Sequence, residues 1–208
     1  MLPVTTEQDP ATIPHPLSLR ERKRIRTRAA LIEAALDLFE RQGYEATTID
    51  EIAAAADVSP RTFFRYFATK EDVALGDDLG PEIVRLLAQR PVEESVLESV
   101  RHVVADVLAM TPDDDQSALL RRLRLVYRTP VLRARRWDFQ LEMGRITGSV
   151  VAGRRGLPPD DLDSRITAGA VFTAIEVAMD HWQQREGRDD LGGLLDTAVD
   201  HLGHAFSD

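Results

Sequence analysis

The chain has 208 residues, carries a formal net charge of −9 and contains no cysteine. The missing cysteines exclude disulfides and thiolate metal sites, and the negative charge argues against a protein that coats nucleic acid without sequence preference. The charge is uneven, since residues 18–71 hold ten Lys and Arg against nine Asp and Glu. The negative charge therefore resides in the remainder of the chain.

The N-terminal tail, residues 1–18, carries four prolines and no apolar segment. We expect it to be disordered and not to be a signal peptide. The longest apolar stretch, residues 168–179, is interrupted by Thr173 and Glu176, so no membrane span is expected. These features predict a cytoplasmic protein that binds neither a membrane nor a cofactor.

The first predicted helix covers about residues 20–42. Its apolar residues recur at intervals of three and four and form one stripe. They are Ile25, Ala29, Ile32, Leu36 and Phe39. Gly43 stands where a C-terminal cap is favoured. Thr48 and Glu51 form a capping-box pattern at the start of a second, short helix, which Asp57 and Val58 interrupt.

A third helix is predicted from about residue 60 to 67, because Ser59 is a good N-cap and Pro60 is favoured at the first helical position. Thr69 then caps a fourth helix that begins at Lys70. Three helices within about fifty residues, the last two joined by a tight turn, predict a helix-turn-helix whose third helix enters the major groove of DNA. The alternative is an unrelated small bundle of helices.

Beyond Gly80 and Pro81 the sequence predicts a second all-α domain, built of long amphipathic helices with short connections. Proline and glycine mark the breaks between these helices. The predicted helices cover about residues 82–89, 92–110, 115–128, 131–154, 162–186 and 190–206. The predicted division is a tail at 1–18, a helix-turn-helix domain at 19–75 and a helical domain for ligand binding and dimerisation at 76–208.

The segment ALIEAALDLFERQGYEATTIDEIAAAADVSPRTFFRYFATKEDV resembles the N-terminal domain of TetR-type (tetracycline-repressor-like) transcriptional regulators, over about residues 25–75. The matching residues are Phe39, Gly43, Tyr44, Thr48, Ile52, Ala53, Val58, Ser59, Phe63, Tyr66, Phe67, Lys70 and Glu71. The resemblance implies an Ω-shaped homodimer of nine or ten helices. Its N-terminal domains would bind a palindromic operator, and its C-terminal domains would dimerise and hold a small-molecule inducer. The C-terminal half is similar to the mycofactocin-system regulator subgroup, which responds to acyl-CoA.

The start of the third helix supplies the predicted base contacts, since the N-terminal end of a recognition helix touches base edges. Arg61 suits guanine, and the methyl group of Thr62 suits thymine. By resemblance, Phe64 and Arg65 point toward the groove or its backbone, and Lys70 contacts phosphate. Hydroxyl groups and further cations would bind other phosphates. The full predicted DNA-binding set is Arg28, Thr48, Pro60, Arg61, Thr62, Phe64, Arg65, Tyr66 and Lys70.

Some of these cations have a second interpretation. Arg65 and Lys70 are also explained as solvated surface charges. The run RERKRIRTR, residues 20–28, has six cations and one anion. It is either an arm along the DNA backbone or in a minor groove, or a solvated charge run. Arg28 is its best phosphate candidate, because it lies nearest the ordered helix.

Aromatic and methionine side chains recur on the long C-terminal helices. Such stripes are common in hydrophobic cores. The resemblance, however, implies an inducer pocket among these helices, and apolar cavities with a few polar groups are usual ligand sites. The predicted ligand-binding residues are Arg124, Tyr127, Trp137, Phe139, Leu141, Phe172, Met179 and Trp182.

Residues 121–136, RRLRLVYRTPVLRARR, contain seven arginines and no acid. One interpretation is a cationic mouth over an apolar pocket, suited to acyl-CoA, a fatty acid or another anionic amphiphile, because arginine binds phosphate and carboxylate well. The other interpretation is a solvated stripe balanced by acidic neighbours such as Glu93, Glu94 and Glu98.

Small side chains on the predicted helix 162–186, together with leucines of the last helix, suggest a four-helix dimer interface. The predicted interface residues are Ala170, Ala174, Ala178, Leu195 and Leu202. His201 and His204 have the spacing of metal ligands, but no third ligand is evident nearby, so we expect no metal.

No Walker loop, nucleophile elbow or HExxH pattern occurs, and no residues are arranged as acid and base. We therefore predict a homodimeric repressor that a small-molecule inducer releases from double-stranded operator DNA, and not an enzyme. The alternative is a constitutive or architectural DNA-binding factor with no inducer.

Overall fold

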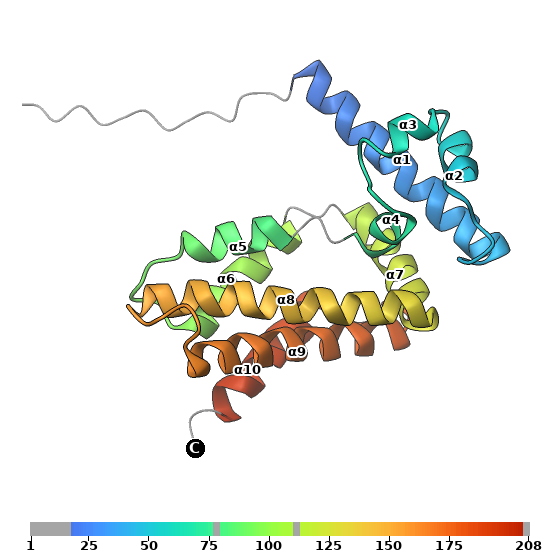
Figure 1. Ribbon diagram of the computed structural model, residues 1–208. Helices are drawn as coiled ribbons and strands as arrows, with labels where there is room; N and C mark the ends of the chain where they lie inside the picture. Colours follow the sequence, from blue (N-terminus) through green and yellow to red (C-terminus); the bar gives the residue numbers. More distant parts are fainter. Residues whose placement is uncertain (1–17, 77–79, 110–112, 206–208) are drawn as a thin grey trace, which may run out of the picture.

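The computed structural model of the chain describes residues 18–76, 80–109 and 113–205. Within these residues the fold has ten helices and no strand (Figure 1), which confirms the predicted all-α class. The helices are α1 (Leu19–Gln42), α2 (Ile49–Ala55), α3 (Pro60–Phe63), α4 (Lys70–Leu75), α5 (Gly80–Ala88), α6 (Val96–Ala109), α7 (Asp113–Arg128), α8 (Pro130–Arg154), α9 (Leu162–Gln184) and α10 (Leu191–Ala205). Apart from Ser18, the tail that we predict to be disordered lies outside the described residues.

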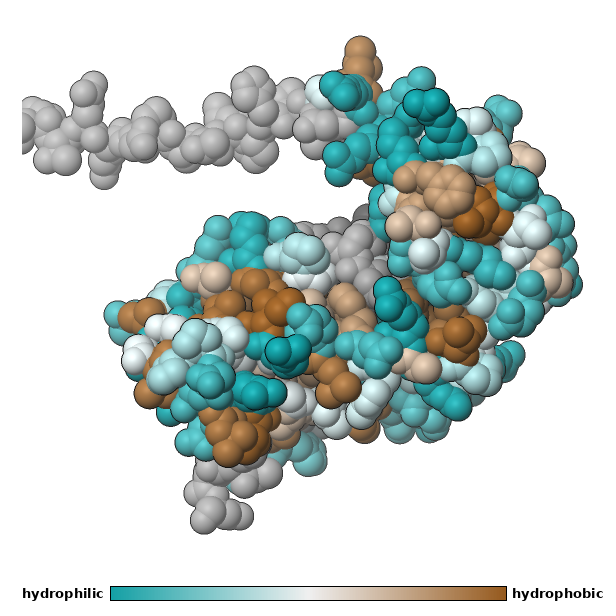
Figure 2. Space-filling view, in the orientation of Figure 1, coloured by the Kyte–Doolittle hydropathy of each residue, from teal (hydrophilic) through white to brown (hydrophobic). Residues whose placement is uncertain are grey.

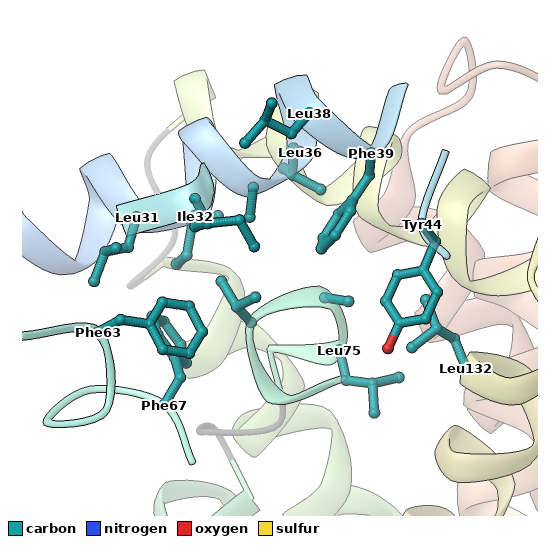
Figure 3. Close-up of a cluster of buried hydrophobic side chains, with 14 of the residues drawn as sticks. Leu31, Ile32, Leu36, Leu38, Phe39, Tyr44, Phe63, Phe67, Leu75 and Leu132 are labelled. Atoms are coloured by element: carbon teal, nitrogen blue, oxygen red, sulfur yellow. The ribbon is translucent and has the colours of Figure 1, made fainter. Parts of the chain in front are cut away.

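Helices α1 to α4 pack around one hydrophobic core (Figure 3). Leu31 and Leu36 of α1, Ile52 of α2 and Phe63 of α3 are almost completely buried. Phe67, which follows α3, is also buried. The expectation that Phe63 and Phe67 face this core is therefore confirmed.

Side-chain caps and a tight turn set the ends of the short helices. The hydroxyls of Thr48 and Ser59 accept hydrogen bonds from backbone N–H groups three residues later, as predicted. The prediction that α3 extends to residue 67 is wrong. The N–H groups of Arg65 and Tyr66 bond to carbonyls only three residues back, at 3.1 and 2.8 Å. This tighter winding ends α3 at Phe63.

Helices α5 to α10 form the larger part of the molecule. The long helices α8 and α9 pack along each other, and α10 packs on α9 and α6 (Figure 1). Trp182 of α9 is buried with Leu191 and Leu195 of α10. Helix α6 begins at Val96, later than predicted, because Ser95 and Glu98 hydrogen-bond to each other's backbone N–H groups and cap the helix there.

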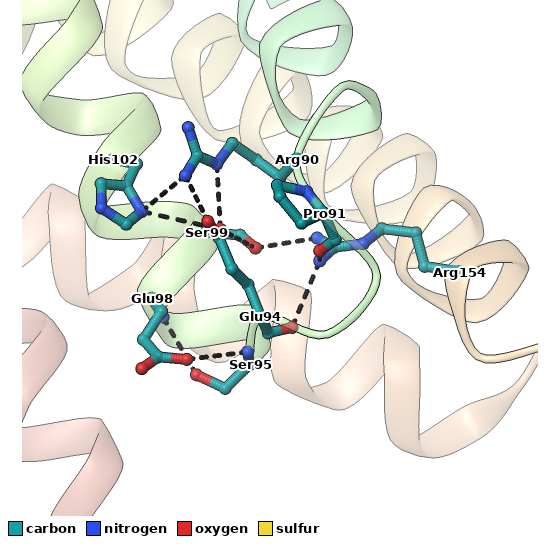
Figure 4. A network of polar contacts seen from close by, with 8 residues as sticks. All are labelled: Arg90, Pro91, Glu94, Ser95, Glu98, Ser99, His102 and Arg154. Carbon is teal, nitrogen blue, oxygen red and sulfur yellow. Dashed lines mark hydrogen bonds and ion pairs between the residues drawn. The ribbon is translucent and has the colours of Figure 1, made fainter.

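A polar network surrounds Glu94, in the segment between α5 and α6 (Figure 4). The Glu94 carboxylate accepts hydrogen bonds from Arg90 at 2.9 Å and from the Ser99 hydroxyl at 3.1 Å, and Arg154 donates to the Pro91 carbonyl at 2.6 Å. The hydrogen bond from Arg90 is the main reason that the pKa of Glu94 is lowered to about 2. The network joins the segment between α5 and α6 to the end of α8.

The two parts of the molecule share a core. Val126 of α7 and Leu132 of α8 are fully buried in the cluster that α1 to α4 form. In Figure 3, Leu132 lies beside Tyr44 and Leu75. The domain boundary at residue 75 stays a prediction, but the packing of the N-terminal unit includes side chains from α7 and α8.

An ion-pair cluster adds a second connection. Arg121 of α7 binds the carboxylates of Glu33, Asp37 and Glu40 on α1, at 2.9, 2.5 and 2.8 Å. The sequence suggested acids at positions 93–98 as the partners of the arginine stripe. For Arg121 that interpretation is wrong, because its partners lie 81 to 88 positions away in the sequence and are brought close only by the packing of α7 on α1.

Candidate nucleic-acid interface and surface hollows

The predicted base contacts lie on α3 and on the two residues that follow it. The exposed residues are Pro60, Arg61, Phe64 and Arg65. Thr62 is half-buried, and its hydroxyl lies 3.0 Å from that of Ser59, which caps the helix. Phe63, between the exposed positions, is buried and holds α3 against α1 and α2. A capped helix start with an exposed guanidinium suits base recognition in the major groove.

Two predicted phosphate contacts have partners inside the protein. Lys70 donates hydrogen bonds to the carbonyls of Tyr44 and Thr47 at 2.8 and 2.9 Å. It is therefore not a merely solvated charge, and one of its three N–H groups remains for a phosphate. The Thr48 hydroxyl donates to Glu51 at 2.9 Å and also accepts from the Glu51 N–H, so a phosphate at Thr48 would compete with this carboxylate.

Tyr66 and Arg28 lie where α1 meets the chain after α3. The pKa of Tyr66 is lowered, first by a hydrogen bond from Arg65 and, among weaker effects, by the positive charge of Arg24 on α1. The Arg28 guanidinium lies 5.2 Å from the centre of the Phe67 ring. Helix α1 therefore contributes to the same surface as α3.

Two hollows open on the outer side of α8 and α9. A hollow of about 520 Å³ adjoins the end of α7, and its lining includes Tyr127, Arg133, Arg136, Trp137, Glu176 and Asp180. A hollow of about 380 Å³ lies between α8 and α9, and its lining includes Trp137, Leu141, Gly144, Ile166, Gly169 and Phe172. Trp137 belongs to both hollows, so the two adjoin each other.

A polar network around Glu176 lines the larger hollow. The Glu176 carboxylate accepts hydrogen bonds from the Tyr127 hydroxyl at 2.6 Å, from the Arg136 guanidinium at 2.8 Å and from the Gln140 amide. Burial, followed by the hydrogen bond to Glu176, raises the pKa of Tyr127. The sequence patterns do not predict this network. The available signal was the single carboxylate inside the apolar stretch 168–179.

The predicted ligand-binding residues are divided between the hollows and the interior. Those that line the hollows are Tyr127, Trp137, Leu141 and Phe172. Trp182 is only 2% exposed and donates its indole N–H to a backbone carbonyl at 2.9 Å, and Met179 packs in the same cluster. Phe139 lies against Gly80 of α5. Arg124 lines neither hollow as far as the described residues show.

Two of the five predicted dimer contacts lie inside the protomer. Ala178 and Leu195 are buried in the cluster around Trp182, and Ala170, Ala174 and Leu202 are half-buried. Large apolar side chains are exposed instead on the outer side of α8 and α9, where Figure 2 shows hydrophobic residues at the surface. They are Trp137, Leu141, Leu162, Ile166 and Val177, each more than half exposed.

None of the helices in residues 18–76, 80–109 and 113–205 combines the length and the hydropathy of a membrane-spanning segment. The same residues contain no group of His, Asp and Glu side chains that could hold a metal ion.

Residues 31–75 match the bacterial regulatory proteins of the tetR family, and residues 94–207 match the MftR C-terminal domain. The HTH-type transcriptional regulator TcmR of Streptomyces glaucescens is 36% identical over 199 residues, which cover 91% of this chain and 88% of the relative. A relative from Mycobacterium tuberculosis, described as a mycofactocin biosynthesis transcriptional regulator, is 26% identical over 84% of this chain and 90% of its own length. The fold resembles that of FadR from Bacillus subtilis in complex with stearoyl-CoA, with a TM-score of 0.53 and 19% identity over 83% of this chain and 95% of that one.

Proposed function

We infer the function from the family: the chain belongs to the tetR family of bacterial regulatory proteins. We propose that it is a homodimeric repressor, which a small-molecule ligand releases from a palindromic operator. The family itself makes the chain a DNA-binding transcriptional regulator and not an enzyme. The shared core supports the response to a ligand. Val126 and Leu132 are buried among α1 to α4, next in sequence to Tyr127 and Arg133, which line the larger hollow. A ligand that displaces α7 or α8 would therefore displace α3 as well, and change the spacing of the two recognition helices.

In this proposal α3 reads the bases and its surroundings bind the backbone. Arg61 forms paired hydrogen bonds with a guanine, and the Thr62 methyl group contacts a thymine. Phe64 and Arg65 face the groove or its rim. The phosphate contacts come from Arg28, Thr48, Tyr66 and the remaining N–H of Lys70.

A second copy of the chain covers the outer side of α8 and α9. Leu162, Ile166, Gly169, Thr173 and Val177 follow one another at intervals of three and four and form a stripe along α9. If two α9 helices cross in opposite directions at Thr173, each Val177 meets Gly169 of the other copy. A Cβ atom at Gly169 would meet no atom within 4 Å, so there is room for the valine. The same crossing brings Arg165 near Asp180 of the other copy, which gives opposite charges at each end.

The ligand in this proposal is an anionic amphiphile that binds in the larger hollow. Arg121 and Arg136 are already paired with carboxylates, whereas Arg133 is exposed and makes no ion pair with the residues that the structure describes. Arg133 would bind the anionic head, and Ala134 and Trp137 would contact the apolar tail. Acyl-CoA is the first compound to test, since the FadR structure of the same fold is a complex with stearoyl-CoA.

Three measurements test the proposal. Selection of bound duplexes from a random pool should yield a palindrome, and light scattering should show a dimer. Acyl-CoAs should then release that operator from the wild-type protein, but not from Arg133→Glu, with Arg135→Glu as a control at an exposed position of the same helix. A palindrome that no acyl-CoA, fatty acid or drug releases would support the constitutive factor instead.

A further inference from the structure

The first turns of α1 form a cationic arm, which we define as residues 19–28. The arm holds six of the chain's cations in an otherwise acidic protein. Its apolar residues, Leu19 and Ile25, are 79% and 54% exposed. In Figure 1 the arm continues α1 beyond its packing on α2, on the side of the molecule that carries α3. These two apolar side chains do not pack into the hydrophobic core, so packing does not explain why the arm is helical and cationic.

One side of the arm adjoins the DNA-binding surface. Positions 20, 24, 27 and 28 lie on one side of an α-helix, and positions 22 and 26 on the other. Arg24 and Thr27 both lower the pKa of Tyr66, after the larger effect of Arg65, which shows that this side of the arm faces Tyr66. Arg28 lies over the Phe67 ring at 5.2 Å. The cations of this side therefore continue the surface that begins at Arg65.

The spacing on this side suits a row of anions. Successive cations at intervals of four residues lie about 6 Å apart along a helix that rises 1.5 Å per residue. Both Arg20 and Arg24 are exposed. Because a helical arm is ordered before it binds, its cations lose little conformational entropy when they meet a regular row of charges.

We propose that Arg20 and Arg24 bind phosphates of the DNA backbone outside the base pairs that α3 reads. The arm adds affinity for any DNA sequence and extends the contacted region of each half-site along the duplex. The inference rests on the DNA binding of the family and is independent of the repressor and ligand proposals.

The test compares two double variants that remove equal charge from opposite sides of the arm. Arg20→Gln with Arg24→Gln should weaken binding to the selected operator and to an unrelated duplex by similar factors. It should lower the slope of log affinity against log salt by about 0.9 for every phosphate that the arm no longer binds. Arg22→Gln with Arg26→Gln is the matched control and should leave the slope nearly unchanged.

Phosphate ethylation interference locates the phosphates that the arm binds. Ethylation of particular phosphates should impair binding of the wild-type protein and of the control, and those positions should become neutral for Arg20→Gln with Arg24→Gln. Equal slopes for the two double variants, or an unchanged interference pattern, would overturn the inference. Circular dichroism and an unaltered melting temperature establish that both variants are folded. Failure of ligand release in the same samples would count against the proposed function only.

Discussion

Two arginines at the recognition helix, Arg61 and Arg65, and two in the larger helical part, Arg121 and Arg136, have opposite surroundings. Arg61 and Arg65 are exposed, and neither forms an ion pair with a residue that the structure describes. In contrast, Arg121 binds three carboxylates of α1, and Arg136 and Glu176 are both mostly buried as a pair. One residue type thus serves two purposes: near α3 its charge remains available to DNA, and at Arg121 and Arg136 it joins helices to each other. Substitutions in the two regions should therefore affect different measurements.

The largest effect is expected where the two regions meet. Leu132→Ala removes a fully buried side chain from the shared core, and should lower the free energy of unfolding by about 2–5 kcal/mol. Val131→Ala is the control, because Val131 is 45% exposed. Urea unfolding followed by circular dichroism measures both. A single transition at lower urea would show that the regions unfold together. Two separate transitions in the wild-type protein would contradict the shared core.

Arg61→Ala should separate DNA binding from stability. Loss of the guanidinium removes a base contact and should cost about 1–3 kcal/mol of operator affinity, while the melting temperature stays the same because the side chain is exposed. Arg41→Ala is the control. It removes an equal charge from an exposed position in the last turn of α1. Fluorescence anisotropy with operators changed at single base pairs measures the effect. If Arg41→Ala weakens binding as much, Arg61 does not read a base.

Arg121→Gln should lower stability rather than operator affinity. It leaves Glu33, Asp37 and Glu40 without their shared partner and should lower the free energy of unfolding by about 1 kcal/mol, since these carboxylates are about half exposed. High salt should reduce the difference from wild type because salt screens exposed charges. Arg128→Gln, exposed on the same helix, is the control. Thermal melting at low and high salt measures both, and a salt-independent loss would argue for poorer packing instead.

The smallest effect concerns Glu94 and acid. Its pKa is lowered to about 2 in the folded chain, mainly by Arg90. A lowered folded-state pKa stabilises the protein fully above the ordinary value of 4.5 and progressively less as the pH falls toward 2. The difference in melting temperature between wild type and Glu94→Gln should therefore be constant near neutral pH and shrink below about pH 4.5. A difference that grows in acid would mean that Glu94 is not held as a carboxylate.

Local patterns in the sequence were sufficient for much of the N-terminal unit. Thr48 and Ser59 cap their helices, and Phe63 and Phe67 face the core, because caps and helical spacing depend on residues only a few positions apart. The early end of α3 was not predictable in this way. A helix cap predicts where a helix starts, whereas the tight hydrogen bonds of Arg65 and Tyr66 depend on how the following turn packs.

Long-range contacts account for most of what the sequence left open. Arg121 looked like part of a ligand mouth because its acidic partners lie far away in the sequence. Trp182 resembled Trp137 as a ligand candidate, yet one is 2% and the other 55% exposed. Helical periodicity shows that a helix has an apolar side, but it does not show whether that side meets α10 of its own chain or solvent. For Ala178, the answer came only from the packing of α9 on α10.

The core shared by Val126, Leu132 and helices α1 to α4 also limits how such chains can be recombined. Consider a chimera that joins a foreign helix-turn-helix to this chain at residue 75. Its Val126 and Leu132 would need a complementary apolar surface on the foreign unit, and its Arg121 would need acidic residues on the first helix. Grafts that carry only the recognition residues of α3 avoid both demands. New operator specificity is therefore easier to acquire by exchanging a few exposed side chains than by exchanging the whole DNA-binding unit.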